Sequence, residues 1–303
     1  MHGLHGAIAA AVTPLRDGGR HVDPEAFPSL VRSLADGGVD GLLACGTTGE
    51  GVLFTVDERR RVAELFLGSR PQGFQIAVHA GAQTTADSTA LAAHALEAGA
   101  NAVALIAPPY FPLDAEELTG HFVQVADACD PLPFYLYEFV GRSGYAIPLD
   151  VIERVRERSS NLRGLKVSDT PFSAVEPYLA FEDLDVFIGN EPLVLQGIER
   201  GAVGAVSGLA TAFPQIVSSL VHERNHGAHE QVQMLRQGLQ GIPFHAAMKE
   251  VLVSTGILTS ADVRAPLRGL TDPERVSVLT LARDVAAATR RLGRSGSLDT
   301  PGA

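Results

Sequence analysis

Short runs of apolar residues recur along the chain, and each run stops at a turn signal. Most of these runs do not alternate apolar with polar residues, and such continuous runs are typical of strands buried on both faces of a parallel sheet. We therefore expect buried parallel strands within residues 6–14, 38–46, 75–81, 101–109, 133–139, 162–169, 184–190 and 201–208.

Segments with helical features lie between these runs. Asp23 and Pro24 open the segment "DPEAFPSLVRSLADGG" as a cap residue followed by a first-turn proline. Thr55 and Glu58 have the spacing of a capping box at the start of "TVDERRRVAELFLG". The order of strand and helix recurs eight times, which predicts a closed (β/α)₈ barrel, or TIM barrel. A doubly wound open sheet is the alternative.

The strand–helix units end near residue 226, and the patterns that follow are helical. We expect the barrel to comprise residues 1–226 and a C-terminal helical appendage to comprise residues 227–291. The last stretch, 292–303, includes "GRSGSLDTPGA" and is small and polar, which predicts a disordered tail.

The composition allows a large core and argues against two classes of partner. The chain has 303 residues, of which 46% are apolar, and this suffices for one large α/β barrel or two ordinary domains. The formal net charge of −11 argues against a nucleic-acid surface and against binding to an anionic membrane.

Cysteine usage and the N-terminus bear on the compartment. Cys45 and Cys129 form neither a C-x-x-C pair nor a metal-ligand spacing, which favours a reducing environment. The N-terminal apolar patch lacks a basic segment before it, and no apolar run approaches membrane-spanning length. We therefore expect a cytoplasmic protein.

The carboxyl ends of the predicted strands single out residues that could carry chemistry, because barrel enzymes place their sites at that end. The stretch "GLLACGTTGEG", residues 41–51, combines two hydroxyls with glycines that allow dihedrals closed to other residues. It forms either a tight turn or a nest of N–H groups for a carboxylate or phosphate. The candidates at this end are Thr47, Thr48, Tyr110, Tyr137, Arg142, Lys166, Asn190 and Glu191.

Lys166 ends the apolar strand "LRGLKVSD" and is open to two interpretations. On the outer face it would extend between helices to water. Inside the barrel, burial would disfavour the ammonium form, and a neutral amine can attack a ketone to form a Schiff base. Tyr137, Thr47 and Tyr110 lie at the same predicted rim, where their hydroxyls could relay the protons that this chemistry needs. Each tyrosine taken alone could equally be a packing residue.

Two further motifs point to other kinds of site. The stretch "HERNH", residues 222–226, matches the H-E-x-x-H zinc pattern, but Asn225 and Gly227 indicate a helix end and the longer zinc-protease continuation is missing. A zinc hydrolase is kept as an alternative of another class, as is a barrel that binds a ligand without catalysis. The loop "GTTGEG" lacks the G-K-[ST] of a P-loop, so no nucleotide site is predicted.

Together these motifs resemble those of the N-acetylneuraminate lyase and dihydrodipicolinate synthase family of Schiff-base aldolases. "GTTGE" (46–50) is similar to the family's carboxylate-binding loop, and "GLK", ending at Lys166, to its Schiff-base strand. Tyr137 with "GRSG" (141–144) is similar to its catalytic tyrosine segment. "PPYFPLDAEEL" (108–118) is similar to the segment that donates a tyrosine to the neighbouring subunit.

The resemblance implies a reaction and an assembly. A 2-oxo acid, usually pyruvate, would form a Schiff base with Lys166, and the resulting enamine would attack an aldehyde, or the same steps would run in reverse. No metal or organic cofactor is needed, because the lysine supplies the electron sink. The assembly would be a homotetramer, a dimer of dimers, in which Tyr110 completes the relay of a neighbour. The residues expected to bind substrate are Gly46, Thr48, Arg142, Gly189, Asn190, Glu191 and Val206.

The sequence departs from the family pattern where the second substrate is chosen. Glu138 follows Tyr137 where the family often has asparagine, and strand alternation turns Glu138 away from the axis as a supporting residue. Asn190-Glu191 contains one acid where sialic-acid lyases have an acidic pair for sugar hydroxyls. Arg142 matches the arginine that dihydrodipicolinate synthases use for the distal carboxylate of their aldehyde. We therefore predict an enzyme of the 4-hydroxy-tetrahydrodipicolinate synthase type, with a 2-keto-3-deoxy sugar acid aldolase or N-acetylneuraminate-type lyase as the alternative.

Overall fold

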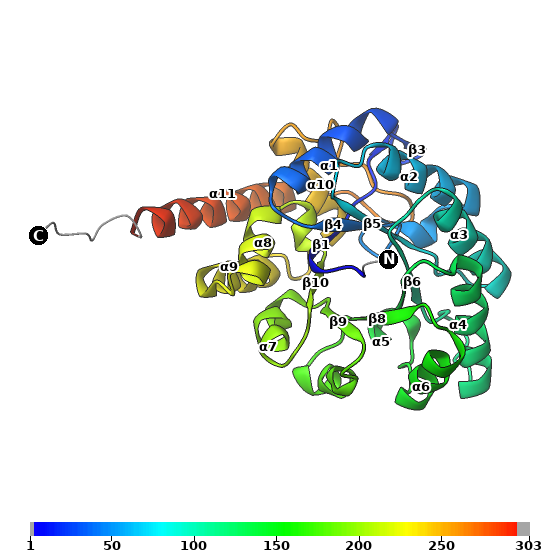
Figure 1. Cartoon of the computed structure of the whole chain (residues 1–303). Helices are drawn as coiled ribbons and strands as arrows, with labels where there is room; N and C mark the ends of the chain where they lie inside the picture. Colours follow the sequence, from blue (N-terminus) through cyan, green and yellow to red (C-terminus); the bar gives the residue numbers. More distant parts are fainter. Residues whose placement is uncertain (1–2, 296–303) are drawn as a thin grey trace, which may run out of the picture.

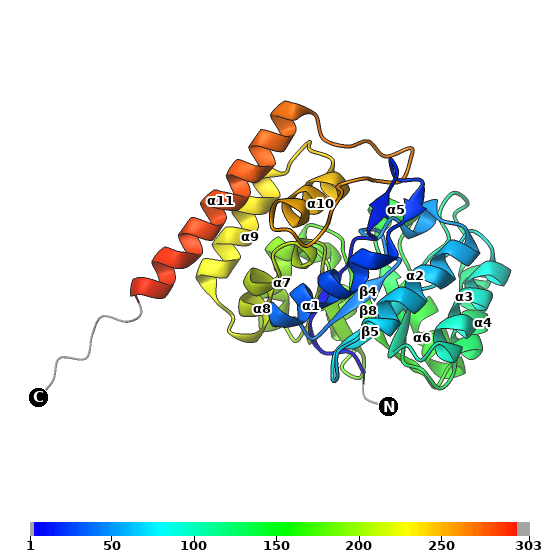
Figure 2. The same cartoon turned by 90° about the horizontal axis from the view of Figure 1, so that it is seen from above.

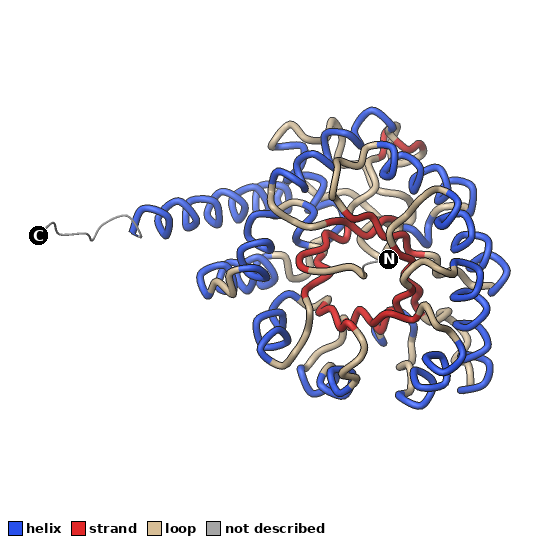
Figure 3. The backbone as a smooth tube through the Cα atoms, in the orientation of Figure 1, coloured by secondary structure: helices blue, strands red, loops and turns tan. Residues whose placement is uncertain are grey.

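Eight parallel strands close into a barrel at the centre of the molecule (Figure 1). The computed structural model describes residues 3–295. β1 pairs with both β10 and β4, so the ring of strands in Figure 3 has no free edge. The strands are β1 (Gly6–Ala10), β4 (Gly41–Ala44), β5 (Gln75–His79), β6 (Ala102–Ile106), β7 (Phe134–Glu138), β8 (Leu162–Val167), β9 (Asp185–Ile188) and β10 (Gly204–Ser207). Each lies within a predicted run, and the predicted (β/α)₈ barrel is confirmed.

Helices cover the outside of the barrel. They are α1 (Phe27–Asp36), α2 (Val56–Gly68), α3 (Thr85–Glu97), α4 (Ala115–Cys129), α6 (Leu149–Arg158), α7 (Val194–Glu199) and α8 (Pro214–His222). The predicted capping box of α2 is present, because the Thr55 hydroxyl accepts from the Glu58 N–H and the Glu58 carboxylate accepts from the Thr55 N–H. Asp23 precedes the short 3₁₀ helix η1 (Pro24–Ala26), but its carboxylate accepts from the Thr259 hydroxyl instead of capping.

Some connections differ from a plain strand–helix repeat. A two-stranded hairpin of β2 (Leu15–Arg16) and β3 (His21–Val22) precedes α1, and the short helix α5 (Val140–Ser143) precedes α6. Between β8 and β9 the chain forms the 3₁₀ helices η3 (Phe172–Ala174) and η4 (Glu176–Ala180) in place of an α-helix. Pro177 explains this difference, since it lies inside the segment that one continuous α-helix would span, and a proline there removes a backbone donor.

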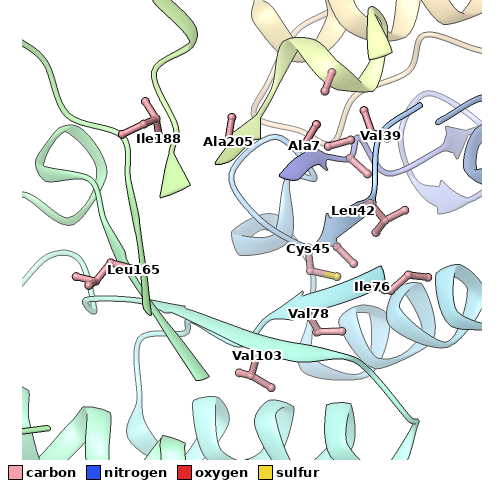
Figure 4. Packing of buried hydrophobic residues seen from close by; sticks show 14 of the residues in the cluster. Ala7, Val39, Leu42, Cys45, Ile76, Val78, Val103, Leu165, Ile188 and Ala205 are labelled. Atoms are coloured by element: carbon pink, nitrogen blue, oxygen red, sulfur yellow. The ribbon is translucent and has the colours of Figure 1, made fainter. Parts of the chain in front are cut away.

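Two apolar clusters fill the fold and leave one end of the barrel for a site. One lies inside the barrel and includes Ile8, Ala77 and Phe187. It also includes Leu4, whose N–H donates to the Tyr135 hydroxyl at 2.8 Å. Leu4 packs at the amino-terminal end of the strands. The other lies between strands and helices, and Figure 4 shows part of it, such as Val78 on β5, Val103 on β6 and Leu165 on β8.

The C-terminal part of the chain is helical and packs on one side of the barrel (Figure 2). It comprises α9 (His226–Gly238), α10 (Phe244–Ser254) and α11 (Asp272–Ser295). In Figure 1, α11 extends away from the barrel. The predicted division at residues 226 and 227 falls at the start of α9 and stays a prediction. Beyond Ser295, the tail predicted for 292–303 lies outside the described residues. Across residues 3–295, none of the helices combines the length and the apolar character needed to cross a membrane.

Candidate active site

A cavity of about 480 Å³ opens where the carboxyl ends of the barrel strands meet the helical appendage. It brings together most of the residues that the sequence singled out, from five separate stretches of the chain. The predicted residues that line it are Thr47, Thr48, Tyr137, Arg142, Lys166, Gly189, Asn190, Glu191 and Val206. Gly46 and Tyr110 are not among the lining residues.

Lys166 points into the barrel. It is in register with Tyr137 on β7 and Phe187 on β9, whose side chains are also buried, and it is itself 7% exposed. Its Nζ lies 4.0 Å from the centroid of the Tyr137 ring. Gly189 makes room for it, because a Cβ there would lie 3.0 Å from Lys166 Cε. The alternative of a lysine on the outer face is therefore wrong.

Two hydroxyls and an imidazole form a chain beside this amine. The Tyr137 hydroxyl lies 3.2 Å from Thr47 Oγ1, and either atom can donate. His245 Nε2 lies 2.9 Å from the Thr47 carbonyl oxygen. Since a carbonyl can only accept, His245 carries its proton on Nε2. The arrangement fixes Thr47 from the side of the appendage and sets its hydroxyl against that of Tyr137.

The loop after β4 presents backbone donors to the cavity. The N–H groups of Thr47 and Thr48 have no acceptor within residues 3–295, and both residues line the cavity. Cys45 and Glu50, on either side of them, have positive φ angles of 57° and 59°. Gly51 is required there, because a Cβ would lie 1.8 Å from the Cys45 carbonyl oxygen. Such a loop, with free N–H groups, suits an anion.

A buried ion pair fixes this loop to the appendage. Lys249 on α10 donates from Nζ to Glu50 Oε1 at 2.5 Å and to the Asp262 carbonyl oxygen at 2.6 Å. Glu50 Oε2 accepts from the Arg264 N–H at 2.6 Å. Burial lowers the pKa of Lys249, and Glu50 opposes that effect.

Tyr110 lies away from the cavity of its own chain. The residue is 84% exposed, its φ is 87°, and its ring packs edge to face against the Phe111 ring with centroids 4.9 Å apart. Gly46 is also outside the cavity, where its carbonyl oxygen accepts from the Gly51 N–H at 3.2 Å. Gly46 thus shapes the loop, and Tyr110 projects outward.

Glu191 is buried and its carboxylate is occupied. Oε1 accepts from Ser207 Oγ at 2.8 Å and from the Leu209 N–H at 3.0 Å. Oε2 accepts from Nε and Nη2 of Arg236. Burial alone would raise the pKa of Glu191, but Arg236 and the two other donors hold it below the usual value. The carboxylate that was expected to contact substrate is engaged by protein donors instead.

Arg142 has no acidic partner in the described part of the chain. Its guanidinium stacks on Phe139, with Cζ 5.2 Å from the ring centroid, and donates to the Gly141 carbonyl oxygen at 3.1 Å. This guanidinium therefore faces the cavity without a carboxylate of residues 3–295 to balance it.

Glu138 turns away from the cavity, as strand alternation predicted. Its Oε2 accepts from the Ile147 N–H at 2.8 Å, and its side chain is buried. Burial and the neighbouring Asp169 raise the pKa of Glu138 to about 8.

Eight of the residues that line the cavity were missed from the sequence, and three of these come from the helical appendage. Arg236 comes from α9, and Phe244 and His245 come from α10. Their segments show only ordinary helical patterns, and the rule that selects strand ends cannot select a residue from an appended helix.

The "HERNH" stretch does not form a zinc site. α8 ends at His222 and α9 begins at His226, so the two histidines do not share a helix face. Asn225 caps α9 by accepting from the Ala228 N–H, and His222 Nε2 lies 2.9 Å from Asp40 Oδ2. Within residues 3–295 no group of three potential ligands could hold a metal. The zinc hydrolase alternative is not supported.

Comparisons with known proteins identify the family of this chain. The sequence model of the dihydrodipicolinate synthetase family matches residues 3–284. An uncharacterized DapA-like lyase of Halobacterium salinarum is 31% identical over 287 residues, which cover 91% of this chain and 92% of the relative. A 4-hydroxy-tetrahydrodipicolinate synthase of Phenylobacterium zucineum is 30% identical over 290 residues, which cover 93% of this chain and 97% of the relative.

Solved structures share the fold. The N-acetylneuraminate lyase of Proteus mirabilis matches with a TM-score of 0.86 and 26% identity, and the match covers 94% of this chain and 99% of the lyase. The match to the family extends over nearly the whole length, through the barrel and most of the appendage. The chain therefore belongs to the dihydrodipicolinate synthetase family, a family of lyases.

Proposed function

We propose that this protein is a Schiff-base lyase in which Lys166 condenses with the ketone of a 2-oxo acid such as pyruvate. The observation that carries the proposal is a buried amine beside paired hydroxyls and free N–H groups in one cavity. A neutral amine is the nucleophile for this reaction.

The carboxylate of the 2-oxo acid would bind the loop after β4. The Thr47 and Thr48 N–H groups and the Thr48 hydroxyl are donors without charge, and backbone donors at a concave turn suit a carboxylate. With the carboxylate bound there, the ketone carbon would face Lys166.

Protons would move through Tyr137 and Thr47. Attack of the Lys166 amine on the ketone gives a carbinolamine, whose hydroxyl must leave as water. Tyr137, whose ring centroid lies 4.0 Å from Lys166 Nζ, would supply that proton from its hydroxyl. Loss of a proton from the carbon next to the iminium gives an enamine. The enamine forms a carbon–carbon bond to an aldehyde, or the reverse sequence breaks that bond, and hydrolysis frees Lys166.

The third hydroxyl of the relay would come from a second copy of the chain. Tyr110 and Phe111 are large, exposed and adjacent, which suits a contact with another subunit. We expect Tyr110 of a neighbour to complete the relay, within a homo-oligomer such as a dimer of dimers.

The second substrate would carry a carboxylate near Arg142. An unpaired guanidinium at the cavity rim can bind a carboxylate through two parallel hydrogen bonds. This favours an enzyme of the 4-hydroxy-tetrahydrodipicolinate synthase type, the activity named for the Phenylobacterium zucineum relative. A 2-keto-3-deoxy sugar acid aldolase, or a lyase of the N-acetylneuraminate type, would share every step up to the enamine.

Borohydride trapping tests the proposal directly. The chain has two lysines, Lys166 and Lys249, and Lys249 is buried in an ion pair, so it serves as an internal control. Pyruvate with borohydride should add one reduced pyruvyl group, located at Lys166 by peptide mass. Lys166→Arg should take up none and lose turnover, since arginine stays protonated. An unmodified Lys166 in a protein that still turns over substrate would refute the mechanism.

A further inference from the structure

Arg236 gives the cavity a fixed guanidinium that no barrel strand supplies. It reaches the cavity from α9, and its side chain is 33% exposed. Nε and Nη2 donate to Glu191 Oε2, and Cζ lies 4.7 Å from the centroid of the Phe244 ring. Nη1 has no acceptor within residues 3–295. The group is therefore fixed on two sides and retains one free donor edge.

Glu191 gives this guanidinium a particular electrostatic character. The Glu191 side chain is 1% exposed, and the donors Ser207 and Leu209 fix its other oxygen. The carboxylate thus holds Arg236 in one orientation and balances its charge. Arg142, the other guanidinium at the cavity, has no such counter-charge in the described chain.

The two arginines therefore suit different groups. A guanidinium can donate but never accept, so Arg236 cannot bind an ammonium, which is also only a donor. Because Glu191 already neutralises it, Arg236 attracts a second carboxylate less than Arg142 does. A neutral oxygen, such as that of a hydroxyl, is the partner that matches a charge-balanced and immobile donor.

We propose that Arg236 is a specificity-determining residue that donates from Nη1 to a hydroxyl oxygen on the carbon chain of the substrate, and that Glu191 is its positioning residue. This rests on the Schiff-base reaction of the proposed function and concerns the choice between the two substrate classes given there. Arg142 alone favours the 4-hydroxy-tetrahydrodipicolinate synthase type, whereas Arg236 selects 2-oxo acids with a hydroxylated chain, of the 2-keto-3-deoxy sugar acid kind, and disfavours aldehydes that carry an ammonium at this position.

The test compares two 2-oxo acids of equal chain length, 2-keto-3-deoxygluconate and 2-oxohexanoate, in borohydride trapping of the full chain. The hydroxylated acid should half-saturate Lys166 at a concentration lower than that of 2-oxohexanoate by about tenfold or more. This is the difference expected for a hydrogen bond to a charged donor. All adduct masses at Lys166 are counted, so cleavage of the sugar acid during the assay does not hide binding.

Arg236→Met should abolish this preference and leave the trapping of pyruvate and 2-oxohexanoate unchanged. The double variant Arg236→Met/Glu191→Gln guards against misfolding, because it removes the buried charge that the single variant leaves unpaired. It should lose the preference in the same way. Glu191→Gln alone should weaken the preference without altering pyruvate trapping, and an unchanged preference would overturn the positioning role.

The failures of the two proposals are distinguishable. If pyruvate leaves no adduct at Lys166, the Schiff-base function fails. If pyruvate is trapped but the wild type treats both acids alike, or if the Arg236 variants keep the preference, the inference about Arg236 fails and the function stands. If Arg236→Met weakens trapping of 2-oxoadipate, which ends in a carboxylate, but not of the sugar acid, Arg236 binds an anion and the hydroxyl assignment is overturned.

Discussion

Lys249→Met should destabilise the protein far more than the loss of a surface charge would. The side chains of Lys249 and Glu50 are both fully buried, and their charged atoms are 2.5 Å apart. Without Lys249, the Glu50 carboxylate remains buried with the Arg264 N–H as its remaining donor. Breaking one partner of a buried pair costs about 3–5 kcal/mol, because an uncompensated charge is left behind.

The same pair connects stability to the site. Glu50 closes the loop that carries Thr47 and Thr48, and its positive φ is a conformation that the surrounding contacts must maintain. Lys249→Met should therefore also raise the pyruvate concentration needed to trap Lys166, although Lys249 itself does not line the cavity.

Urea unfolding measures the first effect. The chain contains no tryptophan, so far-UV circular dichroism is the suitable signal. Glu50→Gln keeps an oxygen for the Arg264 N–H and removes the charge, and Glu50→Gln/Lys249→Met removes both charges. The double variant should lose less than the sum of the single variants, by about 1–3 kcal/mol.

Arg156→Met is the matched control. Arg156 forms an ion pair with Asp183 at 2.8 Å, but both side chains are exposed, and such pairs contribute about 0–1 kcal/mol. If Lys249→Met costs no more than Arg156→Met, or if the two single losses at Lys249 and Glu50 simply add, the pair does not fix the loop and the reasoning is refuted.

Two further predictions concern the groups around β7. Tyr137→Phe keeps the ring over Lys166 and removes the proton, so turnover should fall about 10²–10⁴-fold in a steady-state assay, and a rate near that of the wild type would exclude Tyr137 from the relay. Glu138 has a folded-state pKa of about 8 against an ordinary 4.5, so the folded chain binds this proton more tightly and the free energy of unfolding should fall as pH rises from 4.5 through 8. Glu138→Gln cannot titrate, so urea unfolding at several pH values should show a smaller decline for this variant than for the wild type. If the two proteins lose stability in parallel as pH rises, the raised pKa does not belong to Glu138.

The sequence by itself determined the fold and much of the chemistry. Continuous apolar runs specify strands buried on both faces, and the helices between them leave a closed barrel as the way to bury every strand. The rule that chemistry lies at the carboxyl ends of strands then selected Lys166, Tyr137 and Thr47. These three residues meet because parallel strands in register carry their ends to one rim.

Only the tertiary structure decided which face Lys166 occupies and what Glu191 does. A lysine on a short strand is compatible with either face, and the register with Tyr137 and Phe187 places it inside. Glu191 looked like a free carboxylate, but its oxygens are used by Ser207, Leu209 and Arg236.

Arg236 and His245 reach the site from helices that begin at residues 226 and 244, after the barrel is complete. No local pattern marks them, because their roles follow from where the appendage packs and not from their own segments. Contacts between residues so far apart in the chain are set by the packing of whole elements, and that packing is what the sequence pattern left open.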